Sequence, residues 1–220
     1  MKRPLVILGG PGDGIVAAEI AAAASAAGAP YELVGFLNDA LTRGTIVSGV
    51  PVLGPFEAWS ELSGDVLFLP AVHKVGAMRM RVSRMAKLAI PPERWATVSH
   101  PQSCLARDVR LGRGVLVGSF VTVQPGCVVG DFATIRAGAN LGHDAVVGEF
   151  GYVGPNATLC GRARVGYAAH VGPNAVVMDR IAVGDYAIAG IGAAVTKNVA
   201  VGAVVLGNPA RVISPMLKNN

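Results

Sequence analysis

The sequence has few aromatic residues for its length, and this scarcity limits the kind of core it can build. Aromatic side chains make up 5% of the 220 residues, whereas glycine occurs 29 times. This balance favours an architecture with many tight turns and closely packed backbones. The hydrophobic fraction of 52% still supplies enough apolar surface for a substantial core.

Other absences narrow the class of protein. No apolar run reaches the roughly 18 residues that a membrane-spanning helix needs, so we expect a cytoplasmic protein without a membrane partner. The three cysteines are an odd number without metal-ligand spacing, which argues against a disulfide framework. The net charge of +5 comes with no Lys/Arg-rich run. This disfavours nucleic-acid binding and leaves an anionic small molecule as a partner class.

A six-residue repeat dominates the second half of the chain. From Leu105 to Val201, every sixth residue is Leu, Ile or Val at sixteen of seventeen positions. Glycine commonly follows it, and a small residue commonly stands four positions after it. A period of six suits one short strand and one corner per repeat, so three strands per coil would stack residues 18 apart. One interior ladder of the predicted β-helix contains Leu111, Val129, Val147, Val165, Val183 and Val201.

The repeated Leu/Ile/Val-Gly-x-x-x-x pattern resembles that of the hexapeptide-repeat acyltransferase family. The resemblance implies a left-handed parallel β-helix that assembles as a homotrimer. The handedness comes from the resemblance alone, because ordinary sheet rules predict right-handed crossovers.

The first hundred residues follow a different pattern. Residues 4–9 read as a buried strand, a glycine-containing loop follows at 10–14, and an alanine-rich helix extends to about residue 27. Strands at 32–37 and 65–69 and a basic helix at 79–87 complete a predicted Rossmann-like α/β fold with a parallel sheet. His100-Pro101 marks the predicted boundary between domains of residues 1–100 and 101–220, because a residue before proline favours extended chain.

The glycine loop is a candidate ligand site. Ligands of such sheets bind at the carboxyl ends of the strands, beside backbone N–H groups and a helix N-terminus. However, the glycine spacing departs from Gly-x-Gly-x-x-Gly, and Asp13 would repel a phosphate placed directly on the loop. A tight strand-to-helix turn that binds nothing is the alternative interpretation.

The four histidines discriminate between candidate chemistries. They show no close pairing along the sequence, so we predict no metal site. His143 is predicted to stand in a corner and is followed by Asp144. An imidazole can accept a proton at neutral pH, and a neighbouring carboxylate can fix its tautomer and raise its basicity. Their direct contact requires the corner, because neighbours on a regular strand point to opposite faces. A solvated polar turn is the alternative.

Gly161 stands 18 residues after His143 and is predicted to lie one coil above it. A glycine there would let a backbone N–H approach a thioester carbonyl and stabilise the developing oxyanion. Relief of a crowded corner is an equally good explanation of this glycine.

Four motifs carry a more specific resemblance: Gly142-His143-Asp144, Val147-Gly148-Glu149-Phe150, Gly190-Ile191-Gly192-Ala193 and Gly207-Asn208-Pro209-Ala210. They are similar to motifs of the bacterial sugar O- and N-acetyltransferases of the sialic-acid and bacillosamine type. The resemblance covers essentially the whole chain. It implies His143 as proton acceptor, Asp144 as the residue that raises its basicity, and acetyl-CoA as co-substrate, bound along the outside of the prism between subunits. The implied coenzyme-binding positions are Tyr152, Gly161, Pro173 and Ile191.

The chain departs from this subfamily at four places. Gly12-Asp13-Gly14 replaces the usual Gly-His-Gly, and His73-Lys74-Val75 replaces Gly-Asn/Asp-Asn, both where a nucleotide sugar would bind. Arg136 replaces a usual Asn and Tyr152 a usual His, and we expect these two near the catalytic corner. The predicted substrate-binding residues are Pro11, Gly12, Asp13, Asn38, Asp39 and His73.

Together, these patterns predict an acetyl-CoA-dependent transferase in which His143 deprotonates an amine or hydroxyl of a nucleotide-linked sugar. The changed N-terminal loop leaves room for another small amine or alcohol as acceptor. The alternative function is a non-catalytic trimeric β-helix that binds a sugar nucleotide or organises a complex. The four departures favour that alternative.

Overall fold

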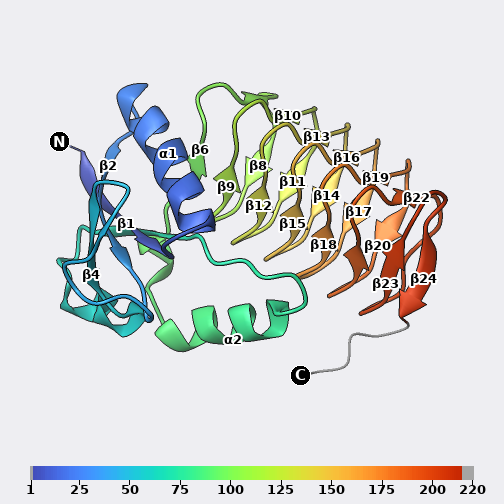
Figure 1. Cartoon of the computed structure of the whole chain (residues 1–220). Helices are drawn as coiled ribbons and strands as arrows, with labels where there is room; N and C mark the ends of the chain where they lie inside the picture. Colours follow the sequence, from blue (N-terminus) through green and yellow to red (C-terminus); the bar gives the residue numbers. More distant parts are fainter. Residues whose placement is uncertain (1, 215–220) are drawn as a thin grey trace.

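An α/β region and a coil of very short strands make up the chain. In the computed structural model, which describes residues 2–214, the coil extends away from the α/β region (Figure 1). None of the helices in this described part is long and apolar enough to cross a membrane.

The α/β region holds a five-stranded sheet. Its strands are β1 (Arg3–Leu8), β2 (Tyr31–Leu37), β3 (Ile46–Val47), β4 (Val50–Gly54) and β5 (Leu67–Pro70), in the order β3-β4-β2-β1-β5. All neighbours are parallel except β3 and β4. The helical segments are α1 (Asp13–Ala26), η1 (Phe56–Glu61), α2 (Met78–Leu88) and η2 (Pro92–Arg94).

The predicted strands and helices of this region are present, with ends within two residues of those expected. The short β3–β4 hairpin was not expected. Because Leu8 pairs with both Leu37 and Pro70, the carboxyl ends of β1, β2 and β5 meet at one edge of the sheet. The loops after these three strands therefore lie together. The description of the region as Rossmann-like stays a prediction.

The repeat region forms three sheets built mostly from two-residue strands, in which all neighbours are parallel except β23 and β24. The sheet that contains β13 comprises β7 (Cys104–Leu105), β10 (Thr122–Val123), β13 (Asn140–Leu141), β16 (Thr158–Leu159), β19 (Val176–Val177) and β22 (Ala194–Val195). The sheet that contains β14 comprises β8 (Arg110–Leu111), β11 (Val128–Val129), β14 (Val146–Val147), β17 (Arg164–Val165) and β20 (Ala182–Val183). The sheet that contains β15 comprises β6 (Val98–Ser99), β9 (Leu116–Val117), β12 (Thr134–Ile135), β15 (Tyr152–Val153), β18 (His170–Val171), β21 (Ile188–Ala189), β23 (Val204–Leu206) and β24 (Arg211–Ser214).

The six-residue period explains this architecture. Pairing residues are 18 apart along most of the coil, as in Val129↔Val147 and Leu141↔Leu159. From β7 to β22 the second residue of each strand points inward, and these residues form one core with the alanines at the corners. The stacked parallel strands fit a left-handed β-helix, which confirms the parallel β-helix predicted from the repeat.

The repeat changes register in the last coil, so the predicted place of Val201 in the interior ladder is wrong. Val183 pairs with Val199, and Ile188 with Val204, so the offset is 16 residues there. Val201 is 61% exposed. The physical reason is a shortened corner, in which the side chain of Asn198 accepts a hydrogen bond from the backbone N–H of Ala182 at 2.9 Å.

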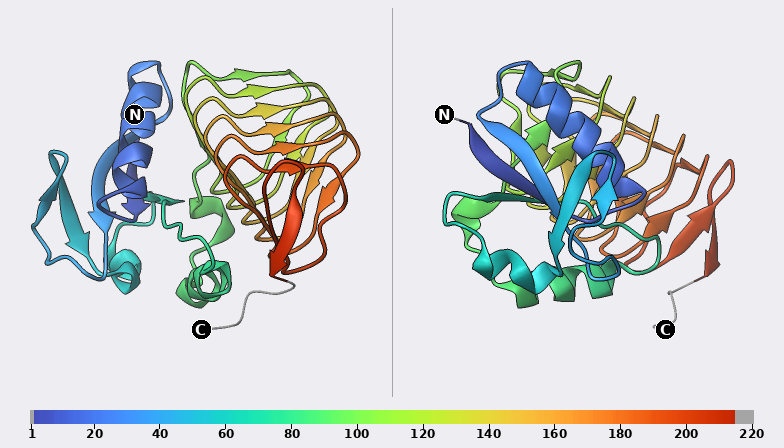
Figure 2. Two further views of the ribbon diagram at one scale, coloured as in Figure 1. Left: turned by 45° about the vertical axis from the view of Figure 1, so that its right-hand side comes forward. Right: turned by 60° about the vertical axis from the view of Figure 1, so that its left-hand side comes forward.

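The α/β region covers the outer face of the sheet that contains β15 (Figure 2). Outward-facing residues of this sheet are buried, including Leu116, Thr134, Tyr152 and His170. Leu116 packs in one apolar cluster with α1 and β1, and Phe150 and Ala168 pack in another with α2. The predicted division into residues 1–100 and 101–220 stays a prediction, and residues 215–220 of the second part lie outside the described residues.

Candidate active site

His143 and Asp144 are in direct contact at the corner after β13. Nδ1 of His143 lies 3.0 Å from Oδ2 of Asp144. Asp144 has a φ of 59°, the left-handed conformation that makes the corner and permits contact between neighbours. With Nδ1–H donating to the carboxylate, Nε2 keeps a lone pair that can accept a proton. The hydrogen bond from His143 also holds the pKa of Asp144 below its usual value.

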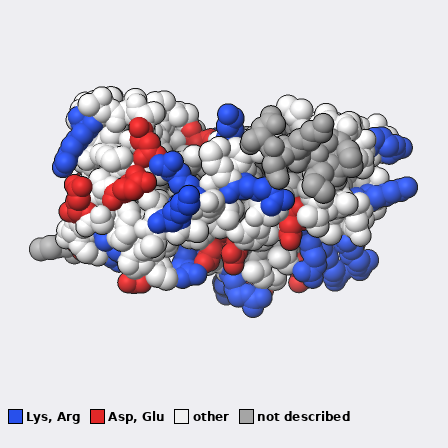
Figure 3. Space-filling view, turned by 90° about the horizontal axis from the view of Figure 1, so that it is seen from below, with Lys and Arg blue, Asp and Glu red and all other residues white. Residues whose placement is uncertain are grey.

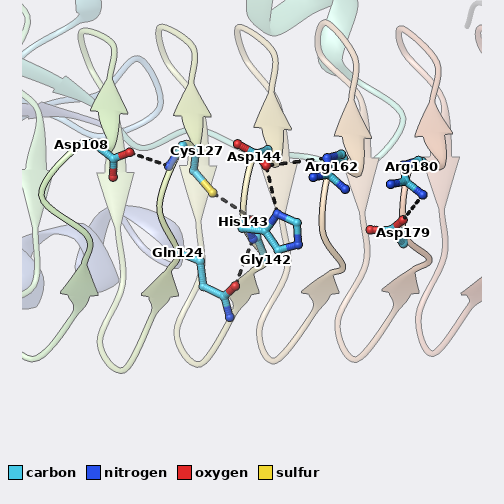
Figure 4. A network of polar contacts seen from close by, with 10 residues as sticks. Asp108, Gln124, Cys127, Gly142, His143, Asp144, Arg162, Asp179 and Arg180 are labelled. Atoms are coloured by element: carbon cyan, nitrogen blue, oxygen red, sulfur yellow. Dashed lines mark hydrogen bonds and ion pairs between the residues drawn. The ribbon is translucent and has the colours of Figure 1, made fainter.

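Residues of the adjacent coils hold this pair in place (Figure 4). The side-chain oxygen of Gln124 accepts a hydrogen bond from the backbone N–H of His143 at 3.1 Å. Nε of Arg162, one coil above, lies 3.7 Å from Oδ2 of Asp144. His143 and Asp144 are each about half exposed, so a substrate can reach them.

Gly161 packs directly against the His143 ring, as the 18-residue stack predicts. A Cβ atom at Gly161 would lie 2.5 Å from Nε2 of His143, closer than real Cβ atoms approach another atom. Among the hydrogen bonds between described backbone groups, none uses the Gly161 N–H as donor. The site therefore combines a proton acceptor with an adjacent free N–H group.

The other predicted coenzyme-binding residues lie elsewhere in the chain. Pro173 and Ile191 occupy successive coils at the corner after β18 and β21, where Ile191 is 70% exposed. Tyr152 lies on β15 and is buried beneath the α/β region. Within one chain, the Pro173–Ile191 corner and Tyr152 therefore lie apart from the corner that holds Gly161.

A cavity of about 390 Å³ opens at the carboxyl ends of β1, β2 and β5. Its wall includes Pro11, Asp13, Asn38, Asp39 and His73, which are five of the six predicted substrate-binding residues. The remaining wall residues are Gly9, Gly10, Ala40, Phe56, Ala71, Val72, Lys74, Ala77, Met80, Arg81 and Arg84. Gly12 is not part of the wall. The basic helix was predicted, but the position of its Arg81 and Arg84 in the cavity wall was not.

Asn38 and Asp39 shape the cavity by binding its loops. The Asn38 amide donates to the carbonyl of Gly9 at 3.1 Å, and its oxygen accepts from the N–H of Ala40 at 2.8 Å. Asp39 accepts from the N–H of Phe56 at 2.9 Å and forms an ion pair with Arg84. Figure 3 shows the face of the molecule that carries α2, where Lys and Arg side chains lie among Asp and Glu side chains.

The carboxylate of Asp13, in the glycine loop, is paired with an arginine of the coil. Its Oδ1 forms an ion pair with Nη1 of Arg136, which follows β12 in the coil.

Arg81, on α2, is 6% exposed and donates one hydrogen bond to the carbonyl of Phe132 at 3.0 Å. Its Nε and Nη1 are buried and have no partner among the described residues. Burial lowers the pKa of Arg81 to about 10, against the opposing effect of Asp13, so it remains a cation at neutral pH.

His73 joins an aromatic stack on the outer face of the β15 sheet. Its ring lies 3.8 Å from that of Tyr152, centre to centre, and the two planes are 13° apart. Nε2 of His73 lies 3.1 Å from Nδ1 of His170. Burial, followed by the charges of His170, Arg81 and Arg136, lowers the pKa of His73 to about 3, and burial lowers that of His170 to about 4. Both rings are therefore neutral at pH 7.

The four departures from the subfamily form one cluster. Arg136 and Tyr152, expected beside the catalytic corner, lie instead against Asp13 and His73 within the chain. The partners are 123 positions apart in the case of Asp13 and Arg136, so no local pattern could have shown the contact. The described residues contain no group of three or more His, Cys, Asp and Glu side chains placed to hold a metal ion.

Comparisons with known proteins agree with the stacked coil. The model of the bacterial transferase hexapeptide (six repeats) matches residues 108–143. No curated protein sequence matches the chain. A solved acetyltransferase domain of PglB from Neisseria gonorrhoeae FA1090, in complex with acetyl coenzyme A, is 30% identical with a TM-score of 0.84, covering 97% of this chain and 100% of that chain.

Two further solved structures share the fold of this chain over nearly its whole length. A histidine-to-asparagine mutant of perosamine N-acetyltransferase from Caulobacter crescentus, in complex with CoA and GDP-perosamine, is 27% identical with a TM-score of 0.84, covering 96% of this chain and 97% of that chain. WeeI from Acinetobacter baumannii AYE is 25% identical with a TM-score of 0.81, covering 97% of this chain and 100% of that chain. The chain belongs to the hexapeptide-repeat acyltransferases, in the subfamily of bacterial sugar acetyltransferases, and it is an acyltransferase.

Proposed function

We propose that the protein transfers an acetyl group from acetyl-CoA to an amino or hydroxyl group of a nucleotide-linked sugar. The observation that carries this proposal is the 3.0 Å contact between Nδ1 of His143 and Asp144, beside the free N–H of Gly161. The PglB domain, solved in complex with acetyl coenzyme A, and the perosamine N-acetyltransferase, solved in complex with CoA and GDP-perosamine, support the choice of substrates.

In the proposed reaction, Nε2 of His143 removes a proton from the acceptor as the acceptor attacks the thioester carbonyl. Asp144 holds the ring so that Nδ1 carries the hydrogen and stabilises the imidazolium that forms. The N–H of Gly161 donates to the developing oxyanion. Collapse of the tetrahedral intermediate breaks the C–S bond, and the imidazolium returns the proton to the leaving thiolate.

The cavity of the α/β region is the proposed acceptor site. Its wall pairs Asp39 with Arg84 and, through the coil, Asp13 with Arg136. Arg81 and Lys74 then remain on the wall without a carboxylate within ion-pair distance among the described residues. Two cations that no carboxylate contacts directly suit the negative charge of a sugar diphosphate. The ion pair with Arg136 also removes the repulsion expected from Asp13.

Assembly would join the two halves of this site. His143 does not line the cavity of its own chain. We therefore propose a homotrimer in which the His143 corner of one subunit faces the cavity of its neighbour. Acetyl-CoA would lie between subunits, against Gly161 of one and against Tyr152 or the Pro173–Ile191 corner of the other. Residues 1–100 would act as the acceptor-binding domain and 101–220 as the transferase domain.

The test is release of free thiol from acetyl-CoA with a panel of UDP-, dTDP- and GDP-linked amino sugars. We expect one sugar to support release, and His143→Ala to reduce kcat by about 100-fold or more, as for other general bases. Unchanged turnover in His143→Ala would refute the mechanism. Binding of acetyl-CoA, seen as a rise in Tm, without release to any sugar would instead favour the non-catalytic scaffold.

A further inference from the structure

Asp179 is a second carboxylate at the His143 corner. It stands 18 residues after Gly161 and therefore one coil above it, so that His143, Gly161 and Asp179 follow one another up the same corner. A Cβ at Gly161 would lie 2.8 Å from Oδ1 of Asp179 and 2.5 Å from Nε2 of His143. Figure 4 shows these two side chains on either side of the coil that carries Arg162. Nε2 of His143 and Oδ1 of Asp179 are therefore no farther apart than the sum of these two distances, a separation that one nitrogen atom between them can bridge with two hydrogen bonds.

Asp179 differs from the other aspartates at its position in the repeat. Asp131 and Asp185 each accept a hydrogen bond from the backbone N–H of the residue one coil below, at 2.8 Å in both cases. Asp179 makes no such bond to Gly161. Its ion pair with Arg180 uses Oδ2, at 3.3 Å from Nη1. Oδ1, which faces the His143 side, makes no hydrogen bond or ion pair with another described residue.

We propose that Asp179 is a catalytic residue that binds the acceptor as an ammonium group beside Nε2 of His143, and so makes the reaction an N-acetylation. This inference rests on the proposed function and names the acceptor class within it. A carboxylate attracts a cationic nitrogen far more strongly than a neutral hydroxyl. The Nε2 lone pair alone would not discriminate between the two.

The proton balance is complete with the groups present. The bound ammonium gives one proton to His143, and the free amine attacks the thioester carbonyl to form the C–N bond. The nitrogen of the resulting tetrahedral intermediate again carries a positive charge, which Oδ1 of Asp179 stabilises until that proton leaves to solvent. The C–S bond then breaks, and the thiolate takes the proton from His143.

The test compares amine acceptors with analogues that carry a hydroxyl in place of the amine, using UDP-, dTDP- and GDP-linked sugars and acetyl-CoA. We expect the unaltered protein to acetylate an amine in strong preference to its hydroxyl analogue. Asp179→Asn keeps the size of the side chain but loses the charge. Its kcat/KM for the amine should fall by about tenfold or more, the effect of losing a charge-assisted hydrogen bond, mainly through a higher KM.

Two control variants isolate this role. Arg180→Gln removes the partner of Asp179 and should change kcat/KM less than threefold, because exposed ion pairs contribute little. Asp185→Asn removes a carboxylate from the same repeat position and keeps an oxygen for the N–H of Tyr167, so its kinetics should match the unaltered protein. All three should keep the Tm of the unaltered protein within a few degrees.

The outcomes separate this inference from the function on which it rests. Equal rates with amine and hydroxyl acceptors, or an unchanged KM in Asp179→Asn, would overturn the role of Asp179 and leave the acetyltransferase intact. A tenfold loss in Arg180→Gln as well would reduce Asp179 to an ion-pair partner. Failure of the unaltered protein to acetylate any sugar would overturn the proposed function itself, and Asp179 with it.

Discussion

The ion pair between Asp13 and Arg136 predicts an asymmetric response to mutation. The two side chains are 31% and 16% exposed, between the fully buried and the fully exposed case. Breaking a buried pair costs about 3–5 kcal/mol and an exposed pair about 0–1 kcal/mol. Asp13→Asn leaves both Arg136 and the buried Arg81 without a nearby carboxylate. We therefore expect it to lower the free energy of unfolding by about 2 kcal/mol.

Arg136→Gln should lower the free energy of unfolding by less, about 1 kcal/mol or below. The reason is that Asp13 keeps its favourable interaction with the charge of Arg81. The double variant should be more stable than the sum of the single effects predicts, by about 1 kcal/mol. The corresponding fall in Tm is about 4–8 °C for Asp13→Asn. Urea unfolding followed by the fluorescence of Trp59 and Trp95 measures all three variants.

A matched control is the ion pair of Arg43 and Glu61, which are 73% and 67% exposed and 4.0 Å apart. Arg43→Gln should change stability by less than about 0.5 kcal/mol. An equal loss of stability in Arg136→Gln and Asp13→Asn, or simple additivity of the two effects in the double variant, would refute this coupling. Either result would mean that Asp13 does not serve both arginines.

Two further predictions concern the histidines. Since the pKa values of His73 and His170 are about 3 and about 4 in the folded chain, the unfolded chain binds protons first as pH falls below about 6.5. The free energy of unfolding should be highest above that pH and should fall below it by up to about 1.4 kcal/mol per pH unit for each histidine. A urea midpoint that stays constant from pH 7 to 4.5 would refute this. Gly161→Ala should lower kcat by about 100-fold, because the added Cβ forces the His143 ring aside. The control Gly64→Ala places its Cβ in open space and should leave kcat unchanged. Equal activity of the two variants would show that the ring position is unimportant.

The sequence by itself determined the coil, its core and the corner that holds His143 and Asp144. A hexad held over many repeats leaves one arrangement in which Leu141 and Leu159 stack inward, and the same offset places Gly161 on His143. Even the contact of His143 with Asp144 was foreseeable, because the period places a corner there. These features follow from a local periodicity, so the order of the residues along the chain is enough to specify them. Their chemical roles remain predictions.

Only the tertiary structure decided how the α/β region meets the coil. The contacts of Asp13 with Arg136 and of His73 with Tyr152 join residues from separate elements, and nothing in the neighbouring sequence specifies them. The departure of Val201 from the ladder likewise depended on how one corner closes. Asp179 shows the same limit on a smaller scale. Its place in the repeat was readable. Only the geometry shows that, unlike Asp131 and Asp185, it accepts no hydrogen bond from a backbone N–H group of residues 2–214 and has an oxygen facing His143.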